Sequence, residues 1–557
     1  MSSKTYDVVI IGGGTSGLVL ANRLSENPDL QILVLETGQD RTGDQNTLTP
    51  GAWPLLTKSE ADWTFPTLTQ EGLGRQVVVP QGKALGGSST INSFLFTSSS
   101  KATVEGWKSL GNEGWNYAAY EEALKKAYTL HNHSGVTEGE GPLQVSLAEP
   151  GSVWEKAWIE GLESEGFPRT SPLSGKLGGP NIAPETIDPK TKQRSYAANT
   201  VVLEKPQSGG VAIAKGVQIT SKAGVSETIG VRKEVILSAG AISSPRLLEL
   251  SGIGGAELLQ RLGIGVVVDN PHVGENLQNH AFTGLTNLKP WPRLCRTTRP
   301  RARGPLSTSN MTAMAQLPLP GLHTEEGRKV IDSLLQQGSD APSRSPATTT
   351  AAFAAAHEEF VRTILTTPLE AAGNYIFGPA YAPFDGPDPN YRAPGKHVAV
   401  AVELSHPLSR GSAHISSADP AEAGTNEGVR IDCGYLTHPL DLEVLARQLR
   451  FMEGLVCRAQ PLARLLKQPV AGRFADLDAA RGYVRRTLDG AYHHTGTCAM
   501  MPRAMGGVVD SRLRVYGCAN LRVCDASIVP LEPTANPQAV VYGVAELADG
   551  FIKKDLV

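Results

Sequence analysis

A glycine-rich turn near the N-terminus constrains the fold of this chain more than any other feature. Residues 12–17 fit the pattern G-x-G-x-x-G. An almost uninterrupted apolar run over residues 6–11 precedes the turn, and Leu18, Ala21 and Leu24 follow it at helical spacing. Such a run favours a strand that is buried on both faces of a parallel sheet. The sequence therefore predicts the strand, turn and helix that open a dinucleotide-binding unit.

Single positions in this segment match the physical demands of dinucleotide binding. Gly12 permits the tight turn, Gly14 lets the backbone approach a pyrophosphate, and Gly17 lets the helix pack against the strand. A second apolar strand over 31–35 ends at Glu36, 19 positions after Gly17, where a carboxylate can accept hydrogen bonds from a ribose. The helix N-terminus attracts the phosphates. Either NAD or FAD satisfies this pattern, and an ordinary glycine turn is the structural alternative.

The charge balance limits the classes of partner. The chain has 557 residues with 52 basic and 55 acidic side chains, a formal net charge of −3. This balance argues against a dedicated nucleic-acid binder and against a polybasic membrane-surface protein. No apolar stretch approaches the roughly 20 residues of a membrane span. Because no targeting signal is recognisable, the expected location is the cytoplasm.

Cysteine usage predicts neither a disulfide framework nor a metal centre. All six cysteines lie in the second half of the chain, and none forms a C-x-x-C pair. A single bridge between Cys518 and Cys524 is left open. No Cys and His spacing is typical of metal ligands, so we expect no bound metal. Cys498 is interpreted as a small buried residue rather than a reactive thiol.

Two further segments are rich in glycine and serine. In residues 82–96, paired glycines followed by serines suit a loop whose amides contact a cofactor, with a surface turn as the alternative. Residues 240–254 follow an apolar strand. There, Ser244 as N-cap and Pro245 at the first helical position predict a short helix that ends at Gly252.

Together, the three glycine-rich segments resemble the glucose–methanol–choline (GMC) flavoprotein oxidoreductases. The second and third segments match the two signature patterns of that family. The resemblance implies FAD rather than NAD, and it extends along most of the chain. Further matching motifs lie at Val273–Gln278, Pro407–Ser412, His493–Met500 and Leu521–Ser527, and in the terminal helix after Asn536.

The resemblance also implies a set of FAD contacts, with Ile219 placed at the adenine. The implied set is Gly12, Gly14, Thr15, Ser16, Gly17, Leu35, Glu36, Trp63, Gly87, Ser88, Asn92, Ser93, Phe94, Leu95, Ile219, Asp525, Ala526, Pro537 and Gln538. Some family members attach the flavin covalently through a histidine just before the signature asparagine. Here that position is Ile91, so we expect a non-covalent FAD.

The resemblance places His493 at the catalytic histidine position and Asn536 at its partner position. A neutral imidazole can accept the hydroxyl proton of an alcohol, and an asparagine can donate a hydrogen bond to the oxygen. Three alternatives remain open: His494 could be the reactive ring, the His-His pair could be structural, or Asn536 could cap the helix that follows Pro537.

The expected fold is α/β, with a Rossmann-like FAD-binding domain interleaved with a sheet-and-helix substrate-binding domain. The FAD-binding domain is predicted from residues 1–145, 205–285 and 510–557. The substrate-binding domain is predicted from residues 146–204 and 286–509.

The expected reaction is oxidation of a primary or secondary alcohol to an aldehyde or ketone, with hydride transfer to flavin N5 and His493 as the base. An aromatic or specialised-metabolite alcohol is the expected substrate class, and oxygen or a quinone is the expected electron acceptor. A redox-neutral lyase or cyclase that keeps the flavin site is the main alternative. A flavin-binding scaffold without catalysis is the third.

Overall fold

A computed structural model describes most of the chain. The described residues are 4–132, 134–147, 153–200, 216–220, 226–289, 307–309, 311–340, 350–378, 384, 396–419, 422, 425–466 and 472–556. Cys295, several stretches between residues 290 and 395, and the first part of the predicted 205–285 segment lie outside the described residues.

The apolar run at the N-terminus forms an inner strand of a five-stranded sheet. β1 (Thr5–Ile11) lies parallel to β2 (Ile32–Leu35) on one side and to β11 (Ser226–Leu237) on the other. β21 (Leu521–Val523) pairs parallel with β11, and β10 (Gly216–Thr220) pairs antiparallel with it. The predicted parallel sheet is confirmed, and strands from three distant parts of the chain build it.

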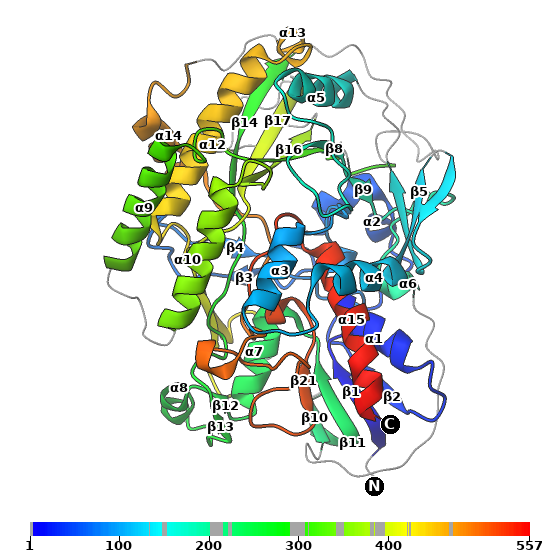
Figure 1. Ribbon diagram of the computed structural model, residues 1–557. Helices are drawn as coiled ribbons and strands as arrows, with labels where there is room; N and C mark the ends of the chain where they lie inside the picture. Colours follow the sequence, from blue (N-terminus) through cyan, green and yellow to red (C-terminus); the bar gives the residue numbers. More distant parts are fainter. Residues whose placement is uncertain are drawn as a thin grey trace.

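Two helices from opposite ends of the chain cover this sheet. α1 (Thr15–Leu24) follows β1 directly and packs against α15 (Gln538–Leu556), the last helix. α15 also packs against α4 (Tyr117–Ala127), so it lies between two N-terminal helices (Figure 1). Val540 and Val544 of α15 are fully buried, which explains the apolar pattern of the C-terminus.

The third glycine-rich segment forms a longer helix than predicted. α7 runs over Gly240–Leu250, so it starts one turn before Ser244 and Pro245. Because Pro245 has no N–H, the carbonyl of Ala241 lacks its helical donor. The hydroxyl of Thr497 donates to that carbonyl instead, at 2.5 Å. The predicted end is correct, since the helix stops before Gly252, which has a φ of +79°.

A six-stranded antiparallel sheet forms the centre of the other half of the molecule. Its strand order is β20-β14-β17-β16-β15-β8. The strands are β8 (Gly179–Ile182), β14 (Ala281–Lys289), β15 (Ala313–Leu317), β16 (Gly373–Gly378), β17 (Lys396–Leu404) and β20 (Asp489–Gly490). This sheet supplies one wall of the candidate site.

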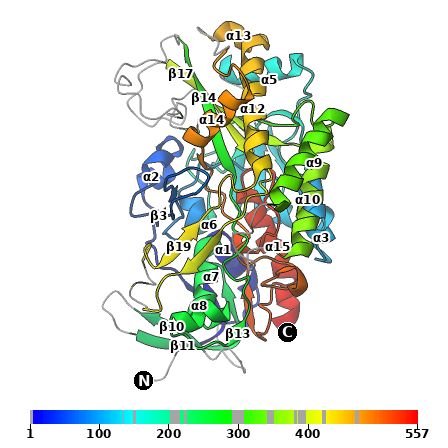
Figure 2. The same ribbon diagram turned by 90° about the vertical axis from the view of Figure 1, so that its left-hand side faces the viewer.

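Helices pack on this sheet in two layers. α12 (Pro439–Arg458) contacts β14 and β17, and α5 (Val153–Ser164) contacts β8 and β15. α9 (Glu325–Asp340) and α10 (Ala351–Thr366) form an outer layer beyond α12, as the side view in Figure 2 shows. The sheet-and-helix organisation expected of a substrate-binding domain is therefore present.

A smaller sheet lies where the two predicted domains meet in sequence. Its order is β6-β5-β7-β9, built from β5 (Tyr128–Asn132), β6 (Gly135–Glu138), β7 (Leu143–Leu147) and β9 (Pro184–Glu185). This sheet joins residues from both sides of the predicted 145/146 boundary. All strands of the five-stranded sheet fall within the predicted FAD-binding segments, and the exact domain boundaries stay a prediction.

The remaining elements are short, apart from two helices over Lys101–Ser109 and Leu477–Thr487. The helices are α2 (Gln45–Leu48), η1 (Pro50–Leu55), η2 (Gly87–Thr90), α3 (Lys101–Ser109), α6 (Ala197–Thr200), α8 (Ala256–Arg261), α13 (Leu462–Leu465), α14 (Leu477–Thr487), η3 (Arg503–Met505) and η4 (Ala526–Ile528). The strands are β3 (Phe65–Pro66), β4 (Val78–Val79), β12 (Ile253–Gly254), β13 (Val268–Asp269), β18 (Ser412–Ile415) and β19 (Val429–Asp432).

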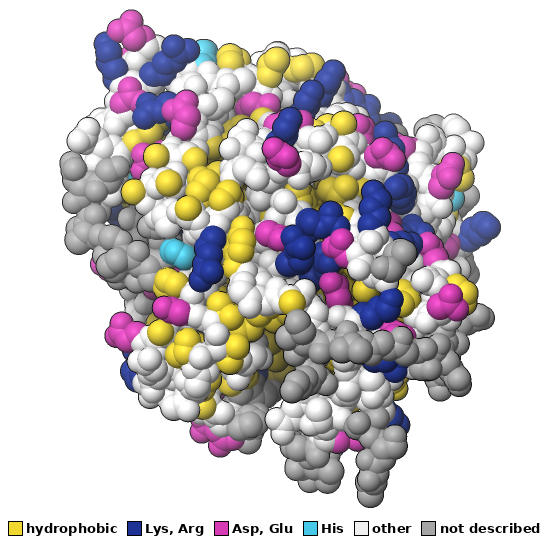
Figure 3. All heavy atoms as spheres, turned by 60° about the horizontal axis from the view of Figure 1, so that its bottom comes forward, with side chains coloured by type: hydrophobic (Ala, Val, Ile, Leu, Met, Phe, Trp, Pro, Cys, Tyr) yellow, Lys and Arg dark blue, Asp and Glu magenta, His cyan; other side chains and the backbone are white. Residues whose placement is uncertain are grey.

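Several surface and covalent features bear on the sequence predictions. Among the described residues, no helix combines the length and apolar character that a bilayer crossing requires. Cys518 and Cys524 are both free, so the bridge left open between them is not formed. On the face shown in Figure 3, basic and acidic side chains are interspersed, as the near-balanced composition suggests.

Candidate active site

In the first glycine turn, the protein's own backbone leaves no room for a side chain at two of the three motif glycines, whereas the third is not crowded in this way. A Cβ on Gly12, whose φ is +107°, would lie 2.3 Å from the carbonyl oxygen of Ser238, and one on Gly17 would lie 2.0 Å from that of Gly12. A Cβ on Gly14 would meet no protein atom closer than 3.6 Å. Gly14 is thus the motif glycine that the protein's own packing does not require, as expected where a phosphate approaches the backbone closely.

The second glycine segment lies directly against the first. Gly86 N–H donates to the carbonyl oxygen of Gly13 at 2.7 Å. A Cβ on Gly87 would lie 2.7 Å from the Cα of Gly14. Ser88 accepts a hydrogen bond from Gly82 N–H at 3.1 Å. The fold therefore brings these two predicted cofactor segments together on one surface.

Glu36 at the end of β2 holds this surface in place. Its two carboxylate oxygens accept hydrogen bonds from Gly13 N–H at 2.9 Å and Gly38 N–H at 2.7 Å. Burial raises the pKa of Glu36, and these backbone hydrogen bonds oppose the shift. Each oxygen keeps capacity for a further hydrogen bond, so Glu36 can hold the loop and a ribose together.

Arg194 organises the predicted cofactor residues Asn92 and Phe94, and the sequence interpretation missed it. The fully buried guanidinium donates to Asn92 Oδ1 at 2.7 Å and to the carbonyl oxygens of Ser89 and Thr47, and it lies 3.6 Å from the centre of the Phe94 ring. Burial lowers its pKa to about 9. Arg194 belongs to none of the sequence motifs. Its role depends on contacts with residues that lie 102 to 147 positions away in the chain.

Asp525 ties the C-terminal motif to α7. Its carboxylate accepts hydrogen bonds from Gly240 N–H at 2.9 Å and Ser244 Oγ at 2.5 Å, and from Ser527 N–H at 2.8 Å. Burial raises the pKa of Asp525. A buried carboxylate at a helix N-terminus is stabilised by the free amides and the helix dipole.

The other predicted FAD contacts occupy several different places. Trp63 stacks on Phe65 with ring centroids 5.4 Å apart, and Lys83 Nζ lies 4.1 Å from the Trp63 centroid. Leu95 is buried, and Ile219 lies on edge strand β10, separated from β1 by β11. The remaining positions are Thr15 and Ser16 in the first turn of α1, Leu35 at the end of β2, Ser93 before Phe94, Ala526 at the start of η4, and Pro537 just before α15.

Buried amide atoms without a protein partner mark the start of α15. Among the described residues, both side-chain amide atoms of Gln538 and the Oδ1 atom of Asn536 are buried without a hydrogen-bond partner. Leaving such atoms unpaired is costly, so a polar ligand is the physical explanation. The polar ring edge of a flavin is of this kind. Together with Gly14, which the protein's own packing does not require to be glycine, these atoms show that the residues present fit FAD.

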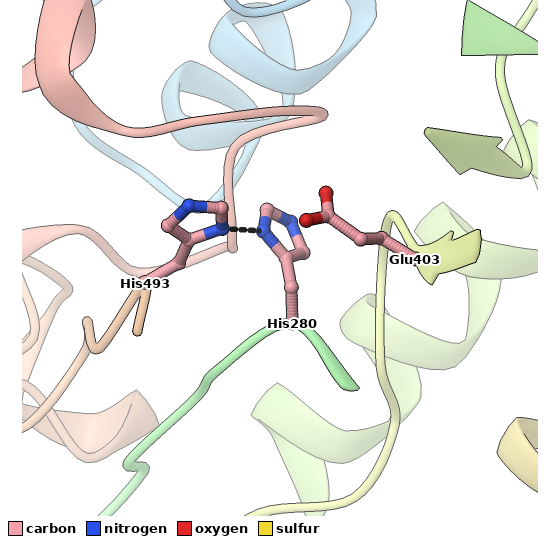
Figure 4. A group of neighbouring side chains, drawn as sticks. All are labelled: His280, Glu403 and His493. Carbon is pink, nitrogen blue, oxygen red and sulfur yellow. Dashed lines mark hydrogen bonds between the residues drawn. The ribbon is translucent and has the colours of Figure 1, made fainter. Parts of the chain in front are cut away.

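His493 lies at the meeting point of both halves of the molecule. The ring is 8% exposed. Its Nε2 atom lies 3.1 Å from Asn536 Nδ2, and its Nδ1 atom lies 2.7 Å from Nδ1 of His280 (Figure 4). The alternative in which Asn536 caps α15 is not observed, because its Oδ1 atom has no hydrogen-bond partner and its amide contacts His493.

His494 is held away from Asn536 by Asn279. Asn279 Oδ1 accepts the backbone N–H of His493 at 2.8 Å, which fixes the orientation of the amide. Asn279 Nδ2 therefore donates to Nε2 of His494, at 3.1 Å. Burial lowers the pKa of His494 to about 3. Of the two rings, His493 is therefore the one that contacts Asn536, beside the unpartnered amide atoms at the start of α15, and this position favours His493 over His494 as a proton acceptor.

Burial keeps the central histidines neutral. The pKa of His493 lies well below its ordinary value because of burial and then because of the neighbouring rings of His280 and His494. Burial also lowers the pKa of His280 to about 4. A neutral imidazole with a free lone pair is the form that can accept a proton.

Four buried polar side chains cross the substrate sheet and end beside His280. Asn181 donates to Gln316 at 2.7 Å, Gln316 to Asn374 at 2.9 Å, and Asn374 to Glu403 Oε2 at 2.6 Å. Burial raises the pKa of Glu403 to about 7. The Glu403 carboxyl lies next to the His280 ring in Figure 4. An isolated polar residue in an otherwise apolar strand was the available signal for this chain of hydrogen bonds.

His280, Glu403 and His493 also form the one group of metal-ligand type found among the described residues. One ligand atom from each lies within 4.8 Å of the others. The two histidine nitrogens nearest each other are already joined by a hydrogen bond. The arrangement is therefore explained without a metal ion.

Cys498, which lies near the histidine pair in sequence, is fully buried in the apolar core. Burial raises the pKa of its thiol well above the ordinary value. Such a thiol remains protonated and unreactive, which agrees with its interpretation as a core residue.

Models of one protein family match most of the chain. Two GMC oxidoreductase family models match, one over residues 6–213 and 193–282 and the other over residues 407–545. A GMC oxidoreductase family protein, Mala s 12 of Malassezia sympodialis, is 32% identical over 99% of this chain and 93% of its own length. Pyranose dehydrogenase 3 of Leucoagaricus meleagris is 29% identical over 99% of this chain and 94% of its own length.

Solved structures give the same assignment. An FAD-dependent oxidoreductase from Chaetomium thermophilum superposes with a TM-score of 0.85 and 26% identity, covering 99% of both chains. A fungal aryl-alcohol oxidase superposes with a TM-score of 0.81, also at 26% identity and 99% coverage of both chains. This protein therefore belongs to the GMC oxidoreductase family, the FAD-dependent enzymes that its glycine-rich segments predicted.

Proposed function

We propose that this enzyme oxidises a primary or secondary alcohol to the aldehyde or ketone, with His493 as the base. The observation that carries the proposal is the contact between two buried side chains from different segments. His493 Nε2 and Asn536 Nδ2 lie 3.1 Å apart, next to the unpartnered amide atoms at the start of α15. The pair offers a proton acceptor and a hydrogen-bond donor at one place.

Each side chain has a distinct role in the reaction. His493 Nε2 accepts the hydroxyl proton, and the Asn536 amide donates a hydrogen bond to the alcohol oxygen as negative charge develops there. Bound FAD would supply the acceptor for the hydride that leaves the alcohol carbon. The alcohol thus loses one proton and one hydride, which accounts for its two-electron oxidation.

A non-covalent FAD is part of the proposal. Ile91 occupies the position before Asn92 and packs in a small buried cluster with Leu56 and Ala61. An alkyl side chain held in such a cluster offers no nucleophile to a flavin. The predicted FAD contacts, from Gly12 to Gln538, are proposed on the same basis. The cytoplasmic location and the use of oxygen or a quinone as acceptor stay predictions.

The substrate class follows from the relatives only in outline. One neighbour is named an aryl-alcohol oxidase and one relative a pyranose dehydrogenase. Both names are those of oxidoreductases, which supports net oxidation over the redox-neutral lyase or cyclase. The joint presence of His493 and Asn536 argues against a scaffold without catalysis.

Anaerobic mixing with candidate alcohols tests the proposal. The holoenzyme is mixed with 4-methoxybenzyl alcohol, pyranose sugars and short primary and secondary alcohols, and the flavin absorbance is followed. We expect at least one alcohol to bleach the oxidised flavin and to yield its carbonyl product. Product formation without bleaching would support a lyase instead. Absence of both bleaching and product across the panel would count against alcohol oxidation.

A further inference from the structure

We propose that His280 is a positioning residue that fixes the tautomer of His493 and leaves the His493 Nε2 atom unprotonated and available as the proton acceptor. The inference rests on the proposed role of His493 as the base. His280 lies just before β14, and it contacts Nδ1 of His493 rather than the Nε2 atom that accepts the proton.

The tautomer of His280 is dictated by two backbone carbonyl groups. Its Nε2 atom lies 2.8 Å from the carbonyl oxygen of Pro533 and 3.0 Å from that of Ser405. A carbonyl oxygen can only accept a hydrogen bond, so Nε2 of His280 must carry a proton. His280 is neutral because burial lowers its pKa to about 4. Its Nδ1 atom therefore has a lone pair and no proton.

This lone pair determines the proton position on His493. The two Nδ1 atoms lie 2.7 Å apart, with the rings nearly perpendicular at 89°. Two lone pairs at that distance would repel each other, so Nδ1 of His493 must be the donor. The neutral His493 ring then has an unprotonated Nε2 atom. The Asn536 amide donates to that atom at 3.1 Å, in agreement with this assignment.

The carbonyl groups of Pro533 and Ser405 can only accept hydrogen bonds, so they fix the His280 tautomer whichever way the amide of Asn536 is oriented. These two carbonyls come from the segment before α15 and from the end of β17, one from each half of the molecule. His280 therefore links the orientation of the base to both halves of the enzyme.

Two buried carboxyl groups flank His280 without competing for its lone pair. Glu532 Oε1 lies 3.8 Å from Nδ1 of His280, beyond hydrogen-bond distance. Glu403 approaches the other side of the ring (Figure 4). The hydrogen bond to His493 is thus the shortest contact of Nδ1 among those that the structure shows. An aspartate performs the analogous tautomer-fixing role in serine proteases.

Two substitutions separate the acceptor function of His280 from its donor function. In His280→Asn, the side-chain oxygen can occupy the position of Nδ1 and still accept from His493. In His280→Gln, the side-chain amide reaches the position of Nε2 and can still donate to the carbonyls of Pro533 and Ser405. If His280 served only to join the two backbone segments, the Gln variant would be the better replacement.

Nitrogen NMR of holoenzyme labelled with ¹⁵N-histidine reads the tautomer without any substrate. The His493 signals are assigned by their loss in His493→Ala. We expect a protonated Nδ1 and an unprotonated Nε2 on His493 in the wild type and in His280→Asn. In His280→Gln we expect this tautomer to be lost or mixed. A wild-type His493 protonated at Nε2, or an unchanged tautomer in His280→Gln, would overturn the proposal.

Flavin reduction by the alcohol that bleaches the wild type provides the second readout. Relative to the wild type, His280→Gln should slow reduction by roughly 10²–10⁴-fold, the range for a misplaced general base. His280→Asn should stay closer to the wild type, and both should retain FAD. Equal rates for the two variants, or a faster Gln variant, would contradict the proposal. Wild-type reduction by His493→Ala would instead refute the proposed function, whereas the NMR result judges His280 alone.

Discussion

The side-chain amide of Asn536 contacts the ring of His493 rather than the first turn of α15, with Nδ2 3.1 Å from Nε2. Asn536 Oδ1 has no protein partner. The Asn536 side chain therefore makes no capping hydrogen bond to α15, in agreement with its proposed role toward a ligand. Substitution of Asn536 should therefore change the activity of the enzyme and the stability of its fold to different degrees.

Replacing Asn536 by alanine should impair the reaction more than the fold. We expect flavin reduction to slow by roughly 10- to 100-fold, because a hydrogen bond to a developing charge contributes about 1.5–3 kcal/mol. The thermal midpoint should change little, since no helix cap is lost. Stopped-flow reduction and a melting curve on the same sample provide the comparison. A large loss of stability at nearly normal reduction rate would restore the capping interpretation.

The two glycines of the first turn should respond differently to alanine. Gly14→Ala should leave the apoprotein as stable as the wild type, since its Cβ would meet no protein atom closer than 3.6 Å. It should nevertheless weaken FAD binding by about tenfold or more, about 1.4 kcal/mol. FAD titration and melting of the apoprotein measure the two effects separately.

Gly12→Ala is the matched control for this prediction. Its Cβ would lie 2.3 Å from the Ser238 carbonyl oxygen at a φ of +107°, so the apoprotein should lose on the order of 3 kcal/mol of stability. If Gly14→Ala destabilises the apoprotein as much as Gly12→Ala does, the glycine at position 14 is required by the protein's own packing and not by a ligand.

Arg194 should be intolerant even of lysine. The guanidinium bonds several groups around Asn92 at once, a geometry that a single ammonium cannot reproduce. We expect Arg194→Lys and Arg194→Met both to lose on the order of 3 kcal/mol of unfolding free energy, and to retain less FAD. Chemical denaturation and the flavin-to-protein absorbance ratio measure these losses. A lysine variant that behaves like the wild type would show that charge alone is required.

Stability should fall at alkaline pH because of His414. Burial would lower the pKa of His414, but hydrogen bonds to Glu249 at 2.6 Å and to Glu275 at 3.1 Å outweigh it and raise the pKa to about 10. The folded state therefore binds this proton more tightly than the unfolded state, whose histidine has an ordinary pKa near 6.5. The contribution is full below about pH 6.5 and is lost as the pH rises toward 10.

Urea denaturation of wild type and His414→Gln between pH 6 and 10 measures this dependence. The wild type should lose stability across the interval, and the difference between the two proteins should shrink as the pH rises. A constant difference would show that the ion pairs of His414 do not carry the pH dependence.

Local patterns predicted the elements around the glycine turn, because each depends on neighbours in sequence. The apolar run before Gly12 became β1, and Glu36 ends β2 as its spacing required. The start of α7 was misplaced, because Ser244 and Pro245 carry the usual signals of a helix start. A hydroxyl from Thr497 compensates the proline, and that contact spans 256 positions.

The parts of the site that sequence reasoning missed are long-range contacts of single residues. Arg194 bonds to Asn92 across 102 positions, and His280 bonds to His493 across 213 positions. Neither belongs to a periodic pattern, so only the folded structure reveals the contact. The proposed catalytic pair, His493 and Asn536, was predicted only through the family resemblance of the surrounding motifs, because a His-His dipeptide alone does not distinguish a base from a structural ring.

Stopped-flow flavin reduction by His493→Ala and His494→Ala tests whether His493 is the base. The two residues are adjacent, but only His493 contacts Asn536, whereas His494 is bound to Asn279. We predict that His493→Ala retains FAD and slows flavin reduction by roughly 10²–10⁴-fold, whereas His494→Ala slows it much less. A nearly normal rate of flavin reduction by His493→Ala would contradict this role of His493, whether or not His494→Ala is inactive.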